Sequence, residues 1–232
     1  MATITDELQD ATQRLVRTVD SLSDEDYAEP SGLPGWSRGH VVAHLALNAD
    51  GLAGAVSGVV QGEAVPMYAS QESRDADIEE LAATEPALLR ERLLRATTLL
   101  ADALGAVPDD RWSTRIERTP GGPTFSAYAV AGMRLREVEI HHADLGVGFT
   151  RADWPASFRA RLLDSMAKRD DWTEPFTVAP VDLDGTWQCG AVTDASPTVS
   201  GAAADLGWWL TGRGDGEGLT SDSGDLPRIE EW

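Results

Sequence analysis

All four histidines of this chain fall in two short clusters, His40/His44 and His141/His142, and Glu137 lies four residues before His141. Residues i and i+4 share one face of a helix. We therefore expect His40 and His44 to project from one helix, and Glu137 and His141 from another. Two imidazole nitrogens and one carboxylate that converge from two helices form the ligand set of a catalytic zinc site with an open fourth position.

Not every histidine in these clusters is expected to bind a metal. The alternative for His44 is a hydrogen-bonded histidine in the core. His40 lies one turn earlier, so it either supports the site from outside the ligand set, which we prefer, or supplies a fourth ligand. On a helix His142 points about 100° away from His141, so we expect it not to be a ligand.

Three more side chains could do chemistry, and for each a structural role is preferred. Glu139 lies on a different helix face from Glu137, and we expect it to be solvated. Asp144 is expected to be a structural residue at a helix end. Cys189 has no histidine near it in the sequence. We expect it to be a buried strand cysteine and not a nucleophile.

The first two-thirds of the chain predicts the helices that position the two clusters. Apolar residues recur at helical spacing from Leu8 to Leu22, where Asp6 can cap the helix start. Ser37 is the expected N-cap of a helix that continues to about residue 60. We expect helix at 73–104, broken near Pro86, and again at 125–145. Four helices with long connections indicate a bundle, and bundles build metal sites between facing helices.

The composition changes after Gly146, which indicates a second domain. An amphipathic helix is expected at 154–169, and short β-like runs follow at 176–178, 185–189 and 198–200. Residues 202–211 predict a short apolar helix, and a tail rich in Gly, Asp and Ser runs to Trp232. The fold class expected is therefore α+β, with a metal-binding helical bundle over residues 1–149 and a small α+β domain over residues 150–232.

The charge excludes some partners. The chain has 232 residues and a formal net charge of −20, from 39 acidic and 19 basic residues. Such a chain repels nucleic acid and anionic membrane surfaces, so we expect neither as a partner. A single cysteine excludes an internal disulfide, and the amino terminus lacks a basic region followed by an apolar run. These features favour a cytoplasmic protein.

Several strings of residues resemble a known family. They are Gly35–His44 (GWSRGHVVAH), Pro66–Tyr68 (PMY), Arg136–Gly146 (REVEIHHADLG), Leu210–Gly214 (LTGRG) and Gly218–Pro227 (GLTSDSGDLP). Together, and in this order, they resemble the mycothiol-dependent maleylpyruvate isomerases from about residue 5 to the end. The first and third strings alone mark a wider superfamily of DinB-like metal-binding four-helix bundles, whose activities vary.

The resemblance implies a fold, a site and a reaction. It implies a DinB-like four-helix bundle followed by a small α+β domain, and one divalent metal, usually zinc, held by His44, Glu137 and His141. Arg213, in the C-terminal domain, would complete the active site. The reaction implied is the cis–trans isomerisation of maleylpyruvate, a small dicarboxylate, to fumarylpyruvate in gentisate breakdown. Its thiol cofactor is mycothiol.

The residues suit that chemistry. A thiolate that adds to the double bond leaves a single bond, which rotates before elimination. Zinc coordination deprotonates a thiol, and Arg213 could hold a carboxylate and stabilise developing charge. The residues Trp36, Asn48, Met67 and Tyr68 line the pocket in this interpretation, or else anchor the core and loops.

Two other functions stay open at this point. The first is a mycothiol-dependent S-transferase or detoxification enzyme of the same superfamily, which would use the same metal and thiol on another electrophile. The second is a non-catalytic metal-binding regulatory protein. That protein would have the fourth metal position closed, for which His40 is the candidate.

Overall fold

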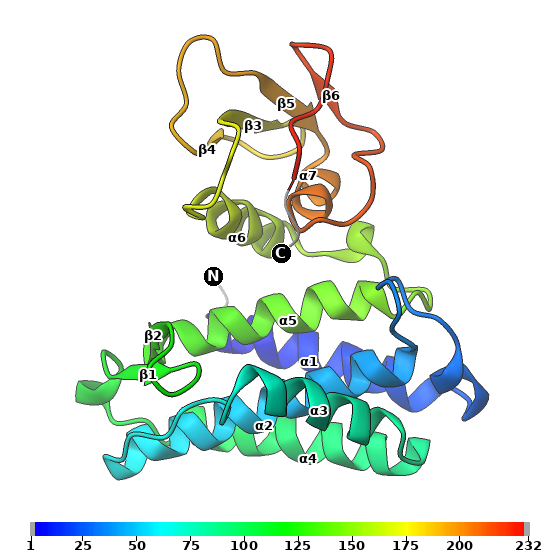
Figure 1. Ribbon diagram of the computed structural model, residues 1–232, viewed down its shortest axis with the longest axis vertical. Coiled ribbons are helices and arrows are strands. Elements are labelled where there is room, and N and C mark those ends of the chain that lie inside the picture. The colour runs from blue at the N-terminus through cyan, green and yellow to red at the C-terminus, as the bar shows by residue number, and fades with distance from the viewer. Residues whose placement is uncertain (1–2, 230–232) are drawn as a thin grey trace. The chain divides into compact units, whose positions relative to one another are not determined.

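The structure, a computed structural model, describes residues 3–229 and consists of two compact units, with the boundary between Gly148 and Phe149 (Figure 1). The first unit is a helical bundle, and the second combines helices with a small sheet. The α+β fold class is confirmed. Residues 1–2 and 230–232, which end the two predicted domains, lie outside the described residues.

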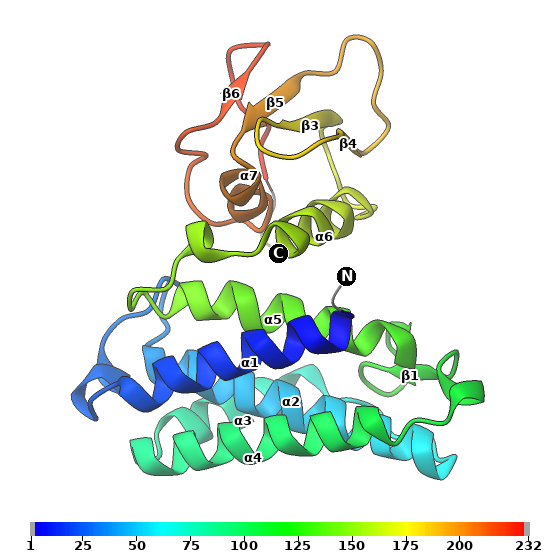
Figure 2. The same ribbon diagram turned by 180° about the vertical axis from the view of Figure 1, so that it is seen from behind.

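Four long helices form the bundle: α1 (Ile4–Ser21), α2 (Arg38–Gln61), α4 (Pro86–Gly105) and α5 (Val130–Asp144). A shorter helix, α3 (Gln71–Ala82), packs on α2. The helix α2 packs chiefly against α4, and α1 against α5 (Figures 1 and 2). The core between them is apolar and includes Leu15, Leu45, Leu52, Leu93, Leu135 and Ile140. Within residues 3–229 no helix is long and apolar enough to cross a bilayer.

Helix ends follow the local sequence. Ser37 caps α2 as predicted, since its hydroxyl accepts a hydrogen bond from the backbone N–H of His40. At α1 the cap is Thr3, and Asp6 completes a reciprocal capping box with it. The predicted break near Pro86 is confirmed, because Pro86 occupies the first turn of α4, where its missing N–H costs nothing.

The fourth long helix begins later than predicted. Residues 125–145 were expected to be helical throughout, but α5 begins at Val130. A short 3₁₀ helix (Ala127–Ala129) precedes it. Before that, β2 (Thr124–Ser126) pairs antiparallel with β1 (Arg115–Glu117) and sets Phe125 opposite Ile116. Thr and Phe favour strands, and a cross-strand apolar pair stabilises a hairpin. Helical spacing alone does not reveal such a partner.

The second unit builds its own core. Two helices, α6 (Ala156–Ala167) and α7 (Ala203–Leu210), accompany a sheet of order β4-β3-β5-β6. Its strands are β3 (Phe176–Pro180), β4 (Trp187–Cys189), β5 (Thr198–Gly201) and β6 (Thr220–Ser221). The strands β3 and β5 run parallel, and the other pairs are antiparallel. The three predicted strands and both helices are confirmed in position, whereas β6 was not predicted.

Candidate metal centre

Three predicted ligands come together inside the bundle. His44 lies on α2, and Glu137 and His141 lie on α5. The Oε2 atom of Glu137 is 2.8 Å from Nε2 of His44 and 3.4 Å from Nε2 of His141. One potential ligand atom from each residue lies within 4.8 Å of the others. The two imidazole rings meet edge to face, with centroids 4.7 Å apart.

The protonation states of His44 and Glu137 suit a cation. Burial lowers the pKa of His44 to about 4, against the opposing effect of Glu137, so its imidazole is neutral at pH 7. Burial would raise the pKa of Glu137, but hydrogen bonds from His141 and His44 hold it well below its usual range. A neutral imidazole and an ionised carboxylate are the forms that bind metals.

Asp144 orients His141. Its carboxylate Oδ2 lies 2.8 Å from Nδ1 of His141, and the side chain is completely buried. Burial would lower the pKa of His141, but hydrogen bonds to Asp144 and Glu137 outweigh it and raise the pKa. In this structure Nδ1 of His141 faces Asp144 and Nε2 faces Glu137. With a metal bound, Nδ1 would keep its hydrogen toward Asp144 and Nε2 would be the ligand atom. This carboxylate–histidine arrangement is typical of metal sites, and Asp144 therefore does more than end the helix as predicted.

Arg74, from α3, was not predicted as a site residue. Its Nη2 lies 3.1 Å from Nδ1 of His44 and donates to it in this structure. The guanidinium also lies over the ring of Tyr68, 5.8 Å from the centroid, and Arg118 approaches the same ring at 5.9 Å. Arg74 thus borders the cluster, and it shares the ring of Tyr68 with Arg118.

The segment that carries Tyr68 is held against α2. The backbone N–H groups of Met67 and Tyr68 donate to the carbonyls of Glu117 and Arg118 at the hairpin. A Cβ at Gly51 would lie 2.7 Å from the carbonyl oxygen of Met67, so only glycine permits this close approach. Met67 is buried, which fits an anchor, and Tyr68 is the residue of the pair that lies beside Arg74.

The two remaining histidines lie outside the ligand set. His40 is engaged in capping α2, with Nδ1 at 2.7 Å from the hydroxyl of Ser37, and its Nε2 lies 3.3 Å from Glu79. His142 lies 2.8 Å from the hydroxyl of Thr18 on α1. These contacts agree with the structural role expected for His40 and with the expectation that His142 is not a ligand.

The prediction for Glu139 is wrong. Its side chain is 1% exposed and accepts a hydrogen bond from Arg14 at 2.6 Å. The face of α5 two residues beyond Glu137 is covered by α1 and not by water. Burial raises the pKa of Glu139 to about 7, although Arg14 opposes this.

Trp36 and Asn48, the other two residues suggested to line the pocket, differ in how close they lie to the cluster. The ring of Trp36 lies 5.7 Å from that of His44, so Trp36 borders the cluster. Asn48 accepts a hydrogen bond from Arg134 at 2.8 Å in the bundle interior.

Arg213 and Cys189 belong to the second unit. Arg213 Nη1 donates to the carbonyl of Thr211 at 3.0 Å, and its guanidinium lies 5.6 Å from the ring centroid of Trp208. Cys189 is a free, buried cysteine on β4, as predicted, and burial raises the pKa of its thiol to about 12. A thiol with that pKa is not a nucleophile at neutral pH.

Most of the chain matches two domain families. It matches the Mycothiol maleylpyruvate isomerase N-terminal domain over residues 8–146 and the MDMPI C-terminal domain over residues 153–231. An uncharacterised protein found in two strains of Mycobacterium tuberculosis is 30% identical over 210 residues, which cover 83% of this chain and 78% of that protein.

Two solved structures resemble this one over 100% of both chains. The crystal structure of the mycothiol-dependent maleylpyruvate isomerase matches with a TM-score of 0.89 and 28% identity. A histidine-to-alanine mutant of that enzyme matches with a TM-score of 0.88 at the same identity. With both domain families matched in order along its length, this chain belongs to the mycothiol maleylpyruvate isomerase family.

Proposed function

We propose that this protein is a mycothiol-dependent isomerase that converts maleylpyruvate to fumarylpyruvate. The observation that carries the proposal is the convergence of His44, Glu137 and His141 in a chain that matches a maleylpyruvate isomerase over its full length. The proposed reaction is thiolate addition to the double bond, rotation about the resulting single bond, and elimination of the thiolate. No atom is gained or lost overall, and the thiol is regenerated.

The metal proposed for the site is zinc. Two imidazole nitrogens and a carboxylate oxygen are donors that zinc accepts. Asp144 lies 2.8 Å from Nδ1 of His141, which leaves Nε2 as the nitrogen that would bind the ion. His44, Glu137 and His141 would hold the ion and leave one position open. When bound there, zinc would supply the acidity that keeps a thiol deprotonated at neutral pH. The single cysteine, free and buried, is compatible with the reducing cytoplasm, which we propose as the location.

Arginines give a strongly acidic chain a way to bind a dicarboxylate. Against a net charge of −20, an anion needs local cations. Arg74 borders the cluster, and Arg213 is the cation that the family resemblance assigns to catalysis. If Nε2 of His44 binds a metal, its Nδ1 carries the hydrogen and cannot accept from Arg74. Nη2 of Arg74 then becomes available to a carboxylate.

The proposed activity is tested by following maleylpyruvate and fumarylpyruvate by NMR with the zinc-loaded protein. We expect conversion only when mycothiol is present, and substoichiometric mycothiol should suffice because it is regenerated. Equal rates with and without the thiol would contradict the proposal, as would no conversion with thiol and zinc both present.

The same assay separates the alternative functions. An S-transferase would consume one mycothiol for each substrate molecule, whereas an isomerase consumes none. A non-catalytic metal-binding protein would turn over nothing. His40, the candidate for closing the fourth position, is instead occupied with Ser37 and Glu79, which removes the main support for the non-catalytic interpretation.

Replacing Arg74 by alanine should weaken substrate binding more than metal binding. One charge-assisted hydrogen bond contributes about 1.5–3 kcal/mol, so kcat/KM should fall by about tenfold or more. The steady-state rate and the zinc content would be measured together. Arg118→Ala is the matched control, because Arg118 approaches the same Tyr68 ring but has no bond to His44. Equal losses in both variants would contradict a specific role for Arg74.

A further inference from the structure

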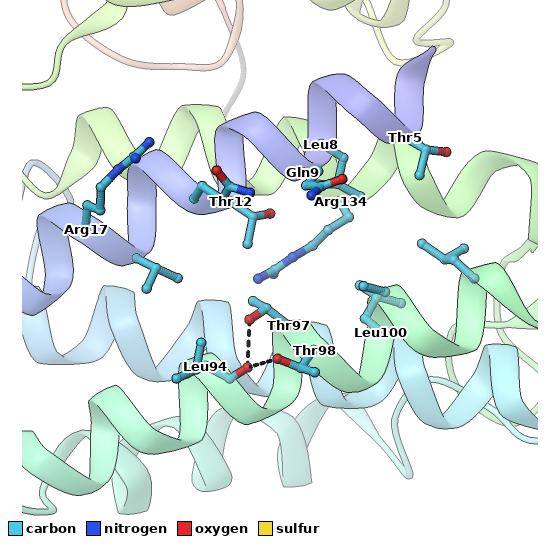
Figure 3. A pocket seen from close by; sticks show the side chains of 14 residues that line it. Thr5, Leu8, Gln9, Thr12, Arg17, Leu94, Thr97, Thr98, Leu100 and Arg134 are labelled. Atoms are coloured by element: carbon cyan, nitrogen blue, oxygen red, sulfur yellow. Dashed lines mark hydrogen bonds between the residues drawn. The ribbon is translucent and has the colours of Figure 1, made fainter. Parts of the chain in front are cut away.

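A second cavity lies elsewhere in the bundle, between α1 and α4 (Figure 3). Its volume is about 520 Å³, within the range of small-molecule sites. None of the three candidate metal ligands lines it. Its lining includes Leu8, Thr12, Val16, Thr97, Leu104 and Arg134.

Arg134 is the unusual member of this lining. It comes from α5, and Figure 3 shows its guanidinium reaching into the space between α1 and α4. The residue is 1% exposed. Its Nη1 donates to the side-chain oxygen of Asn48 at 2.8 Å, whereas its Nη2 has no hydrogen-bond partner among residues 3–229. In the same described range, no carboxylate forms an ion pair with it.

A buried guanidinium with only a neutral amide for a partner is energetically unfavourable. Burial lowers the pKa of Arg134 to about 10, so the group still carries its charge at neutral pH. Glu137 and Asp50 favour its charged form from a distance, but no carboxylate among residues 3–229 contacts the guanidinium. An anion that enters the cavity would supply both the missing charge and the missing acceptor.

The walls indicate what the rest of such an anion is like. The side chains of Leu8, Val16 and Leu104 present apolar surface. The hydroxyls of Thr97 and Thr98 both donate to the carbonyl of Leu94 in their own helix, as the dashed lines in Figure 3 show. Their protons are therefore used within α4. The cavity thus offers one buried cation and a largely apolar wall.

We propose that this cavity binds a small amphiphilic carboxylate, whose head group accepts hydrogen bonds from Arg134 and whose hydrocarbon body packs against Leu8, Val16 and Leu104. The exposed Arg17, which also lines the cavity, adds positive charge that favours entry of the anion. No residue that lines this cavity is a candidate metal ligand, although Arg134 lies one turn before Glu137 on α5.

Calorimetric titration of the full-length protein with octanoate tests the proposal. Octanol is the neutral control with the same chain, and acetate is the charged control without it. We expect saturable binding of octanoate with a stoichiometry of one, and at least about tenfold weaker binding of octanol, the size expected for one charge-assisted hydrogen bond. Octanoate and octanol binding equally, or no saturable octanoate binding up to millimolar concentration, would overturn the proposal.

Two variants locate the site. Arg134→Met should remove the preference for octanoate over octanol. Ala101→Trp, which fills the cavity from α4 without altering Arg134, should abolish octanoate binding. Ala87→Trp is the matched control, on an exposed position of the same helix outside the cavity. If Arg134→Met does not fold, Ala101→Trp decides: octanoate binding unchanged in that variant would place the ligand elsewhere and refute the site.

Discussion

His44→Ala should lose most of its zinc and all measurable isomerase activity. The substitution removes one of three donors that lie within 4.8 Å of one another, and it leaves Glu137 and His141 as an incomplete set. A cavity left by a buried imidazole also costs stability, so the variant should be checked by circular dichroism before its metal content is measured. Metal analysis by mass spectrometry and the mycothiol-dependent assay then give the two readouts.

His40→Ala is the matched control for that experiment. His40 lies one turn earlier on the same helix and belongs to the cap of α2. Its loss should reduce stability by less than about 1 kcal/mol, because Ser37 still caps the backbone N–H of residue 40, and it should leave the zinc content unchanged. Full zinc content in a folded His44→Ala protein would show that the three residues are not the ligand set. Zinc loss in His40→Ala would assign His40 to it.

The local sequence predicts a large part of the bundle. Ser37 and Pro86 mark helix starts because their chemistry acts within one turn, on backbone groups next to them in the chain. The spacing of His44, Glu137 and His141 is likewise a local property, since i and i+4 fix a shared face. Spacing within one helix does not show which helix it packs against. That α2 and α5 bring the three side chains together is seen only in the structure.

The features that the sequence did not predict depend on contacts between residues far apart in the chain. Glu139 is buried because Arg14, 125 positions away, lies on the helix that covers it. Arg74 approaches His44 from a separate helix that carries no motif of its own. Phe125 is in a strand because Ile116 pairs with it. In each case the contact that determines the environment joins residues far apart in the sequence. The periodicity of a single helix therefore predicts the wrong environment for the side chain, or none.

Arg134 is a further case of this kind. Its position three residues before Glu137 places it on nearly the same inward face of α5, although no motif marks it. It is buried and bonded to Asn48, which lies one turn after His44 on α2. The pair thus lies directly beside the ligands along both helices. That this buried guanidinium lacks an ion pair becomes visible only from the cavity between α1 and α4, which the sequence does not show.

Arg213→Ala should keep its zinc and its fold but lose isomerase rate by a factor of about 10²–10³. That is the scale of removing one donor that stabilises developing charge. The substitution removes a guanidinium that donates to Thr211 and lies over Trp208, both within the second unit, so the metal ligands of the bundle keep their own partners. Zinc content, circular dichroism and steady-state rates with mycothiol give the three readouts.

Arg213→Lys separates charge from geometry. A lysine keeps the positive charge but lacks the planar fork that binds a carboxylate through two parallel hydrogen bonds, so we expect it to recover little of the lost rate. Arg159→Ala is the matched control in the second unit, because Arg159 forms a surface ion pair with Asp182 and should contribute little. Full activity in Arg213→Ala, or recovery of the full rate with lysine, would refute the role proposed for Arg213. A rate loss of the same size in Arg159→Ala would show instead that the second unit tolerates no loss of charge, and that Arg213 has no special part in the reaction.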